Sequence, residues 1–378
     1  MIDRDKTILQ ILPKLDAGGA ERVAIEIAEA VKQTGARSLI VAEDGALARF
    51  VKRADVEIIH LPVSTKNPLK IRKNAKKLKK IIKENRVDLV HAHSRAPAWS
   101  AYLATKRLGV PFVTTYHAAY SEKGMFKRRY NRVMVSGDRV VAVSNFIADL
   151  IKSRYHIDSK KINVIYNGVD PVKFDPASVR GDRAVRLAKE WRIEDGQSAI
   201  LLPARLTNLK GQKLFIEALA KMRHQEAVGV LVGSDQGRHS YTQELMKLAV
   251  ESGVGGRLRL AGHLDDMPAA LKIADIVVNC SLQPEAFGLT IIEAQAMAKI
   301  VVATNHGGAR ETIEPNVSGF LVPPNDAEAL AAVFDMILEG NIEMRLAFGA
   351  HARQMVIERF SLAAMQDQYL KLYEEILG

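Results

Sequence analysis

The chain has 378 residues, of which 48% are hydrophobic and 26% are charged, and its formal net charge is +11. At roughly 150 residues per domain this length suggests two domains, and the apolar content excludes intrinsic disorder. No apolar run reaches the ~18 residues that a membrane-spanning helix needs. The single cysteine, Cys280, cannot form an internal disulfide and the N-terminus lacks a signal-peptide pattern, so both features favour a cytoplasmic location. The excess of positive charge predicts an anionic partner.

The first half of the chain alternates short apolar runs with amphipathic segments, which is typical of a parallel sheet with right-handed crossovers. The predicted strands are residues 7–12, 37–41, 56–61, 87–91, 111–116, 139–143 and 162–165. The pair Gly18 and Gly19 follows the first strand, directly before a predicted helix at residues 20–34. Glycines at such a turn let backbone N–H groups approach an anion, although a plain tight turn explains them as well.

Positive charge is concentrated between Lys66 and Arg86, a segment with eight lysines, two arginines and one glutamate. Apolar residues at helical spacing predict that one stripe of a helix packs on the domain, formed by Ile71, Ala75, Leu78 and Ile82. A second basic group consists of Lys123, Lys127, Arg128, Arg129 and Arg132. Two interpretations stay open, a solvated helix face or a surface that docks on an anionic membrane. Nucleic acid is disfavoured, because no interleaved aromatic residues accompany these charges.

Three histidines gather at the ends of two predicted neighbouring strands. His91 and His93 alternate along one strand and therefore share a face, and His117 follows the next strand. Three imidazoles can ligate zinc, but no cysteine or acidic partner accompanies them, so packing roles are expected for His91 and His93. His117 is the preferred functional residue. Nearby Arg95 fits either an acceptor-binding role or an ordinary loop position.

After a linker at residues 167–176, the strand pattern restarts. The predicted strands of the second half are residues 199–202, 229–232, 257–260, 276–279 and 300–303. Arg205 and Lys210 follow the first of them, and Lys210 is expected to be an exposed loop residue that contributes little to the core. Cationic side chains in one loop can clamp a diphosphate through charge-assisted hydrogen bonds.

Two glutamates in the second half, Glu285 and Glu293, are eight positions apart. Glu285 lies in the loop after a predicted strand, and Glu293 lies inside a helix predicted for residues 288–298. The first N–H groups of that helix, from Gly288 to Thr290, can hold a phosphate. A glutamate at a helix start is commonly only a favourable cap. A ligand site is therefore indicated by the two glutamates together with Gly288 and the loop of Arg205 and Lys210. Phosphate-binding P-loop, nicotinamide-binding and hydrolase-elbow motifs do not occur, and no aspartate pair suited to a metal lies near these loops, so no metal is expected.

These residues together resemble the GT-B glycosyltransferases of family 4, and the resemblance covers nearly the whole chain. The matching motifs are Gly18-Gly19-Ala20-Glu21, Thr114-Thr115-Tyr116-His117, Val141-Ala142-Val143-Ser144, Asn167-Gly168-Val169-Asp170, Arg205 with Lys210-Gly211, the pair Glu285/Glu293, and the loop from Asn305 to Glu311. The resemblance implies an α/β fold with two Rossmann-like doubly wound domains that face a central cleft. It implies an acceptor-binding domain at residues 1–169, a nucleotide-sugar-binding domain at 170–358, and a C-terminal helix, 359–378, that returns to the first domain.

The resemblance also implies roles for single residues. Arg205 and Lys210 hold the donor diphosphate, Glu285 binds hydroxyls of the donor sugar, and Glu293 binds the ribose. The amides of Phe287, Gly288, Leu289 and Thr290 lie near sugar and phosphate, Gly18 and Gly19 close over the phosphate, and His117 lies near the transferring sugar. The expected catalytic group therefore consists of His117, Glu285, Arg205 and Lys210.

The expected function is a retaining, metal-independent transfer of a hexose from a nucleotide sugar, preferably mannose from GDP-mannose, with no cofactor beyond the donor. The expected acceptor is a lipopolysaccharide-core or lipid-linked glycan at the inner face of the cytoplasmic membrane, which the segment Lys66 to Arg86 contacts. Alternatives are a soluble family 4 enzyme that makes a small glycoside or polysaccharide, a GT-B relative of another reaction class such as an epimerase, and a non-catalytic nucleic-acid-binding protein. Retention of the full residue set argues against the last two.

Overall fold

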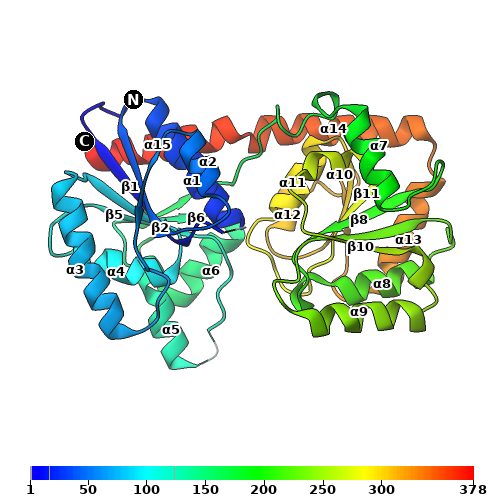
Figure 1. The fold of residues 1–378 in the computed structure, drawn as a ribbon, viewed down its shortest axis with the longest axis horizontal. Coiled ribbons are helices and arrows are strands. Elements are labelled where there is room, and N and C mark those ends of the chain that lie inside the picture. Colours follow the sequence, from blue (N-terminus) through cyan, green and yellow to red (C-terminus); the bar gives the residue numbers. More distant parts are fainter. Residues whose placement is uncertain (1, 17, 123) are drawn as a thin grey trace. The chain divides into compact units, whose positions relative to one another are not determined.

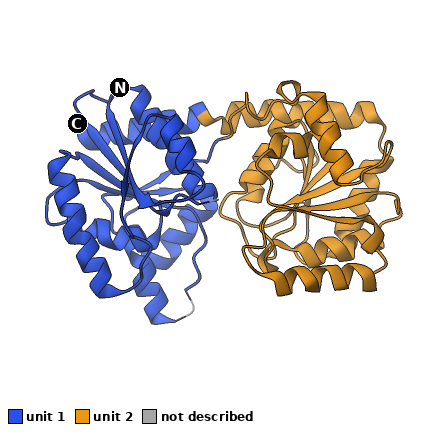
Figure 2. Ribbon diagram, in the orientation of Figure 1, with its two compact units in different colours: residues 1–168, 363–378 blue, residues 169–362 orange. Residues whose placement is uncertain are grey.

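The computed structural model describes residues 2–16, 18–122 and 124–378. The chain divides into two compact units (Figure 2): unit 1 is Met1–Gly168 with Ala363–Gly378, and unit 2 is Val169–Leu362. The chain therefore passes between units at 168/169 and again at 362/363, where the sequence predicted 169/170 and 358/359. In unit 2 the two connecting stretches pair with each other, because the N–H groups of Val169 and Leu362 donate to the carbonyls of Phe360 and Val169.

Unit 1 contains a seven-stranded parallel sheet in the order β3-β2-β1-β4-β5-β6-β7. Its strands are β1 (Thr7–Lys14), β2 (Arg37–Glu43), β3 (Glu57–His60), β4 (Leu89–Ala92), β5 (Phe112–Tyr116), β6 (Arg139–Ala142) and β7 (Ile162–Val164). All seven predicted strands are confirmed, with ends that differ by up to two residues. The central strands β1, β4 and β5 are buried along most of their length, which explains why they read as mostly apolar segments in the sequence.

Helices cover both faces of this sheet (Figure 1). One face carries α1 (Gly19–Gln33), α2 (Ala48–Arg53) and the C-terminal helix α15 (Leu362–Leu377). The other face carries α3 (Pro68–Glu84), α4 (Arg95–Thr105), α5 (Met125–Asn131) and α6 (Asn145–Tyr155). The predicted return of the C-terminal helix to the first domain is confirmed, since Tyr369 and Tyr373 of α15 are fully buried and hydrogen-bond to unit 1.

The basic helix α3 begins at an Asn67 cap, whose side chain accepts from the N–H groups of Leu69 and Lys70, with Pro68 at its first position. The predicted apolar stripe is confirmed, because its four residues are each at most 8% exposed: Ile71, Ala75, Leu78 and Ile82. The lysines of α3 that lie away from this stripe are exposed: Lys70, Lys73, Lys76, Lys77, Lys80 and Lys83. The second basic group lies on and after α5, apart from Lys123, which is outside the described residues. Within the described part of the chain, no helix is long and apolar enough to cross a membrane.

Unit 2 contains a six-stranded parallel sheet in the order β10-β9-β8-β11-β12-β13. Its strands are β8 (Ala199–Pro203), β9 (Val228–Val232), β10 (Leu258–Gly262), β11 (Ile276–Asn279), β12 (Ile300–Thr304) and β13 (Phe320–Val322). The first five correspond to predicted strands. The sequence did not predict β13, a three-residue edge strand that is too short to produce a hydrophobic pattern.

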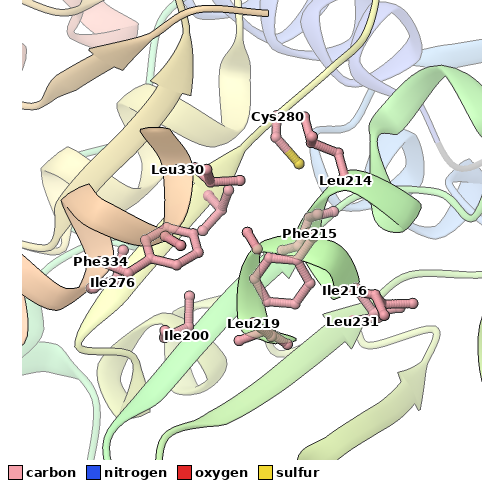
Figure 3. Close-up of a cluster of buried hydrophobic side chains, with 14 of the residues drawn as sticks. Ile200, Leu214, Phe215, Ile216, Leu219, Leu231, Ile276, Cys280, Leu330 and Phe334 are labelled. Atoms are coloured by element: carbon pink, nitrogen blue, oxygen red, sulfur yellow. The ribbon is translucent and has the colours of Figure 1, made fainter. Parts of the chain in front are cut away.

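Helices again cover both faces of the sheet in unit 2. One face carries α8 (Gln212–Lys221), α9 (His239–Glu251) and α13 (Ala327–Glu339). The other carries α7 (Gly181–Glu190), α10 (Met267–Ile273), α11 (Leu289–Ala296), α12 (Ala309–Thr312) and α14 (Ile342–Phe360). Figure 3 shows the core between the sheet and α8 and α13, where Phe215 and Phe334 meet edge to face at 6.3 Å. Cys280, which directly follows β11, belongs to the same core.

Candidate functional site

A partly buried ion pair marks the candidate site of unit 2. Lys210 ends a short 3-10 turn (Asn208–Lys210) after β8, and Glu285 lies in the loop between β11 and α11. Because β8 and β11 are neighbours in a parallel sheet, both residues lie near the edge formed by the strands' carboxyl ends, where ligands bind in open α/β sheets. Lys210 Nζ donates to Glu285 Oε1, so the structure brings two of the predicted site residues into direct contact.

Two further side chains hold the Glu285 carboxylate in place. Ser281 donates its hydroxyl to Oε1, and Asn279 Nδ2 donates to Oε2 at 3.3 Å. Asn279 also donates to the hydroxyl of Thr290, at 3.2 Å, in the first turn of α11. The carboxylate is therefore oriented from three directions. A carboxylate fixed in this way can accept hydrogen bonds from hydroxyl groups of a ligand.

The charge state of Glu285 follows from opposing effects. Burial raises the pKa of a carboxyl group, but the charge of Lys210 and the hydrogen bonds from Lys210, Ser281 and Asn279 outweigh it, so the pKa of Glu285 lies below its usual value. Glu285 is therefore ionised at neutral pH. The side chain of Lys210 is only 29% exposed, so it is half-buried against this carboxylate, and the expectation of an exposed loop lysine was wrong.

A small pocket lies beside this pair in unit 2. It is lined by Leu202, Pro203, Ala204, Lys210, Val278, Asn279, Ser281, Glu285 and Thr290. Three predicted residues, Lys210, Glu285 and Thr290, thus line one pocket. Arg205 is exposed on the loop after β8 and does not line it, and Glu293 is buried within α11.

Glycines allow backbone segments to approach closely around Glu285. Gly307 has φ +61°, and a Cβ there would meet the backbone N of Glu285 at 2.9 Å. The N–H of Gly308 donates to the carbonyl of Glu285 at 2.9 Å, and a Cβ at Gly308 would meet the backbone N of Phe287 at 2.7 Å. The loop from Asn305 to Glu311 therefore supports the chain on which Glu285 is carried, which gives the glycines of this predicted motif a structural purpose.

The start of α11 lies next to this loop. Gly288 precedes the helix in a left-handed conformation, with φ +99°, which favours glycine. The predicted phosphate-binding amides, those of Leu289 and Thr290, belong to the first turn of α11. The side chain of Phe287 is buried and packs edge to face on Phe360 at 5.6 Å, so Phe287 can contact a ligand only through its backbone.

Unit 1 carries a different cluster at the carboxyl ends of β1, β4 and β5. His93 Nδ1 lies 3.1 Å from His117 Nε2, and His93 Nε2 lies 2.7 Å from Oε1 of Gln10. His91 hydrogen-bonds with Tyr373 at 2.5 Å and with Thr115 at 2.7 Å. His91 and His93 are fully buried, whereas His117 is partly exposed at the sheet edge.

Burial controls the charge of these rings. It lowers the pKa of His117 to about 3 and the pKa values of His91 and His93 well below 6.5, and the neighbouring rings add to the effect for the latter two. All three are therefore neutral at pH 7. Their nitrogens face tyrosine, threonine, glutamine and each other instead of one common point, and the described residues include no group of three side chains suited to hold a metal ion. The zinc interpretation thus has no geometric support.

The remaining predicted residues of unit 1 follow the strands β1 and β4. Gly18 directly precedes α1 at the turn after β1, as predicted, and Gly19 is the first residue of the helix. The guanidinium of Arg95 stacks on Tyr120 at 4.1 Å and donates to Asn131 at 2.8 Å. These contacts favour a structural role for Arg95, since they use its planar face and one of its donors.

Sequence reasoning missed several polar partners of the two sites. Gln10 interrupts the apolar run of the first strand, and such an isolated polar residue in a buried strand is a signal that could have been used. Asn279 and Ser281 flank Cys280 at the end of β11 and have no motif of their own. The sequence assigned Tyr373 no polar role, but its hydroxyl hydrogen-bonds with two side chains.

Comparison with known proteins gives matches along nearly the whole chain. The family described as Glycosyltransferase Family 4 matches residues 17–173, and the family described as Glycosyl transferases group 1 matches residues 186–355. A crystal structure of a glycosyltransferase from Rickettsia africae is 39% identical, covers 99% of both chains and has a TM-score of 0.90.

Two curated relatives differ in their acceptors. The D-inositol 3-phosphate glycosyltransferase of Salinispora tropica is 31% identical over 72% of this chain, and the match spans only 61% of that protein's length. The UDP-Gal:alpha-D-GlcNAc-diphosphoundecaprenol alpha-1,3-galactosyltransferase of Escherichia coli is 24% identical, over 98% of this chain and 96% of that protein.

Proposed function

Because the chain belongs to the GT-B glycosyltransferases of family 4, we propose that it transfers a hexose, with retention of configuration, from a nucleotide sugar to a lipid-linked or lipopolysaccharide-core glycan. The observation that carries the proposal is the pairing of Lys210 with Glu285, which Ser281 and Asn279 hold at the carboxyl ends of β8 and β11. A fixed cation and a fixed carboxylate match the two parts of such a donor, the diphosphate and the sugar hydroxyls.

The proposed chemistry depends on charge that develops as the nucleoside diphosphate leaves. Negative charge grows on the β-phosphate, and groups fixed in advance lower the barrier because they need not reorganise. In our proposal Lys210 and the first N–H groups of α11 face this charge, and Arg205 joins them from the exposed loop. These groups supply the positive charge that a metal ion provides in other transferases, so we propose transfer without a metal.

Retention follows in this proposal from reaction on one face of the sugar. The leaving phosphate takes the proton of the acceptor hydroxyl as the new glycosidic bond forms, so no covalent enzyme intermediate is needed. Glu285 binds sugar hydroxyls in this scheme and does not attack the anomeric carbon. Its three hydrogen-bond donors favour this role, because they reduce the basicity of the carboxylate.

The proposed acceptor class is supported by the surface of unit 1. The exposed lysines of α3 form a dense cationic face, and each such residue near an anionic membrane contributes about 1 kcal/mol. On α5, Met125 and Phe126 are 85% and 90% exposed next to Lys127 and Arg128. Apolar side chains among cations suit the boundary of a membrane, so we propose that unit 1 contacts the cytoplasmic membrane from its inner face.

The relative that acts on an inositol phosphate supports a second candidate. A soluble acceptor with a phosphate group also suits a basic protein, and the cationic face of α3 would then have no part in the reaction. The donor is equally open to test. The sequence resemblance favours GDP-mannose, whereas the name of the Escherichia coli relative contains UDP-galactose.

One experiment addresses these points together. The protein is incubated with GDP-mannose, UDP-glucose, UDP-galactose or UDP-N-acetylglucosamine, each with a polyprenyl-diphosphate sugar, a lipopolysaccharide core or inositol 3-phosphate, and the product is analysed by NMR. We expect an α-linked product from an α-linked donor on a lipid-linked acceptor, and equal rates with and without EDTA. An inverted anomeric centre would contradict the retaining mechanism, loss of activity in EDTA would contradict the metal-free scheme, and transfer only to inositol phosphate would favour the soluble alternative.

A further inference from the structure

The polar network of unit 1 connects the C-terminal helix with His117. We propose that the hydroxyl of Tyr373 fixes, through Gln10 and His93, which nitrogen of His117 carries the proton, so that His117 Nδ1 is a hydrogen-bond acceptor. Tyr373 is then a positioning residue of the transferase site, although 256 sequence positions separate it from His117. The consequence for catalysis depends on the function proposed above, whereas the proton position does not.

The first step is the orientation of the Gln10 amide. Gln10 is fully buried in β1, between α15 and β4. Its Nε2 donates to the Tyr373 hydroxyl at 3.1 Å, and its Oε1 lies 2.7 Å from Nε2 of His93. An amide has one donating and one accepting end. With the donating end on Tyr373, the accepting end requires a proton on Nε2 of His93.

The second step passes this requirement to His117. A neutral imidazole has one N–H and one nitrogen with a lone pair, so a proton on Nε2 of His93 leaves its Nδ1 as an acceptor. That Nδ1 lies 3.1 Å from Nε2 of His117, which must then donate. His117 is itself neutral at pH 7, because burial lowers its pKa to about 3. Its proton is therefore on Nε2, and Nδ1 keeps a lone pair.

The third step is the coupling of Gln10 to His91 through the hydroxyl of Tyr373. Its hydroxyl accepts from Gln10 and has one proton to give, which goes to Nδ1 of His91 at 2.5 Å. His91 then donates from Nε2 to Thr115 at 2.7 Å, and the Thr115 hydroxyl lies 3.3 Å from the hydroxyl of Tyr369. With Nε2 of Gln10 donating to Tyr373, every bond in this series has one compatible direction. Reversal of any one of them requires rotation of the buried Gln10 amide and a proton shift on all three rings.

This arrangement predicts what His117 offers to a substrate. An Nδ1 lone pair accepts a hydrogen bond from a hydroxyl of the sugar or of the acceptor, whereas a protonated Nδ1 would donate to the oxygen of that hydroxyl and leave the hydroxyl proton without this partner. A fixed tautomer of His117 therefore orients the substrate without the free-energy cost of a proton shift at each turnover. Loss of the Tyr373 hydroxyl leaves the amide of Gln10 free to rotate, so both tautomers of His117 become populated.

The experiment compares two buried tyrosines on the same helix. Tyr373→Phe removes the hydroxyl that contacts Gln10, and Tyr369→Phe removes one that contacts only Thr115 in this network. The full-length protein is labelled with ¹⁵N-histidine, and the ring nitrogens of His117 are assigned by the signals that disappear in His117→Gln. The ¹⁵N shifts report directly which nitrogen is protonated, in the absence of substrate and of activity.

We expect an Nε2–H tautomer of His117 in the unmodified protein and in Tyr369→Phe, and a mixture of tautomers in Tyr373→Phe. With a working donor and acceptor, kcat should fall about tenfold in Tyr373→Phe with KM nearly unchanged, which a merely structural defect does not predict. If Tyr373→Phe fails to fold, Gln10→Met removes the same connection and should give the same mixture. A proton on Nδ1 in the unmodified protein, or an unchanged tautomer in both variants, overturns the proposal. If the NMR signals show the expected tautomers but no donor and acceptor give glycosyl transfer, the proposed function is overturned and the proton position stands.

Discussion

Units 1 and 2 have the same construction, a parallel sheet covered by helices on both faces, but they stabilise polar groups at the carboxyl ends of their strands in opposite ways. Unit 1 holds three neutral imidazoles, two of them fully buried, and connects them to tyrosine, threonine and glutamine. Unit 2 holds an ionised pair, Lys210 with Glu285. A neutral network suits a group that must accept or donate a hydrogen bond, and an ion pair suits a site for a charged ligand.

The two regions also differ in where their partners lie in the sequence. In unit 2 the contact spans 75 positions between two loops at the same edge of one sheet. In unit 1 the contact between Gln10 and Tyr373 spans 363 positions and joins the first strand to the last helix. Helix α15 therefore completes the polar interior of unit 1, so truncation of the C-terminus would damage the site of the first unit.

The largest effect is expected from Lys210→Ala, which breaks the ion pair of unit 2. The rate of transfer should fall by a factor of about 10²–10³, because the fixed positive charge that faces the leaving diphosphate is lost. The variant should also lose about 1–3 kcal/mol of stability, since the partly buried carboxylate of Glu285 is left with fewer partners. Steady-state kinetics and urea unfolding measure the two effects.

Two controls separate the charge from the fold in this test. Lys213→Ala breaks a more exposed pair with Glu244 in the same unit and should change stability by less than about 1 kcal/mol. The double variant Lys210→Met with Glu285→Gln should regain most of the lost stability without regaining activity. Normal kinetics in Lys210→Ala with every accepted donor would contradict the diphosphate role.

The second prediction is that mild acid destabilises unit 1 before unit 2. The folded pKa values of His91, His93 and His117 lie below the value of about 6.5 for an unfolded histidine. The unfolded chain therefore binds more protons below pH 7, so the stabilisation present above pH 6.5 is lost as the pH falls. Between pH 7 and pH 6 each histidine lowers the free energy of unfolding by about 0.7 kcal/mol. The three together therefore increase the equilibrium constant for unfolding of unit 1 about thirtyfold.

Unit 2 provides the internal reference for this measurement. The pKa values of Glu285 and Asp335 are lowered in the folded state, so their contribution is present above the carboxyl pKa of the unfolded chain, near 4, and is lost only below it. Hydrogen exchange, corrected for its intrinsic pH dependence, should show faster exchange in β4 and β5 at pH 6 and no change in β8 and β11. Equal acceleration in both units would contradict the assignment of buried neutral histidines.

The sequence was a good guide to the sheets and to Lys210 and Glu285, for physical reasons. Buried parallel strands produce largely apolar runs, so twelve of the thirteen strands in the described residues could be located; β13, an edge strand of three residues, could not. Lys210 and Glu285 follow adjacent strands and therefore had to lie near each other. The hydrogen bonds of Gln10 and Tyr373 could not be predicted, because they depend on how α15 docks on the sheet, which neither periodicity nor motif spacing determines.

The smallest effect is expected for vesicle binding, which distinguishes the cationic surface of α3 in unit 1 from the surface of unit 2. Lys73, Lys76, Lys77 and Lys80 on α3 are exposed, and their replacement by glutamate should weaken binding to phosphatidylglycerol vesicles at least tenfold at low salt. The charge-matched control in unit 2 replaces four exposed residues by glutamate, namely Arg186, Lys189, Lys221 and Lys247. This control should bind vesicles almost as the unmodified protein does.

Because the apolar stripe of α3 is packed in the core, binding should be mainly electrostatic. It should decline steeply between about 0.1 M and 1 M salt, as the Debye length falls from about 10 Å to about 3 Å. Turnover of a water-soluble acceptor should survive the α3 change, since Lys210 and Glu285 belong to unit 2. Equal co-sedimentation of the α3 variant and the control, or no binding of the unmodified protein at low salt, would mean that α3 is only a solvated face.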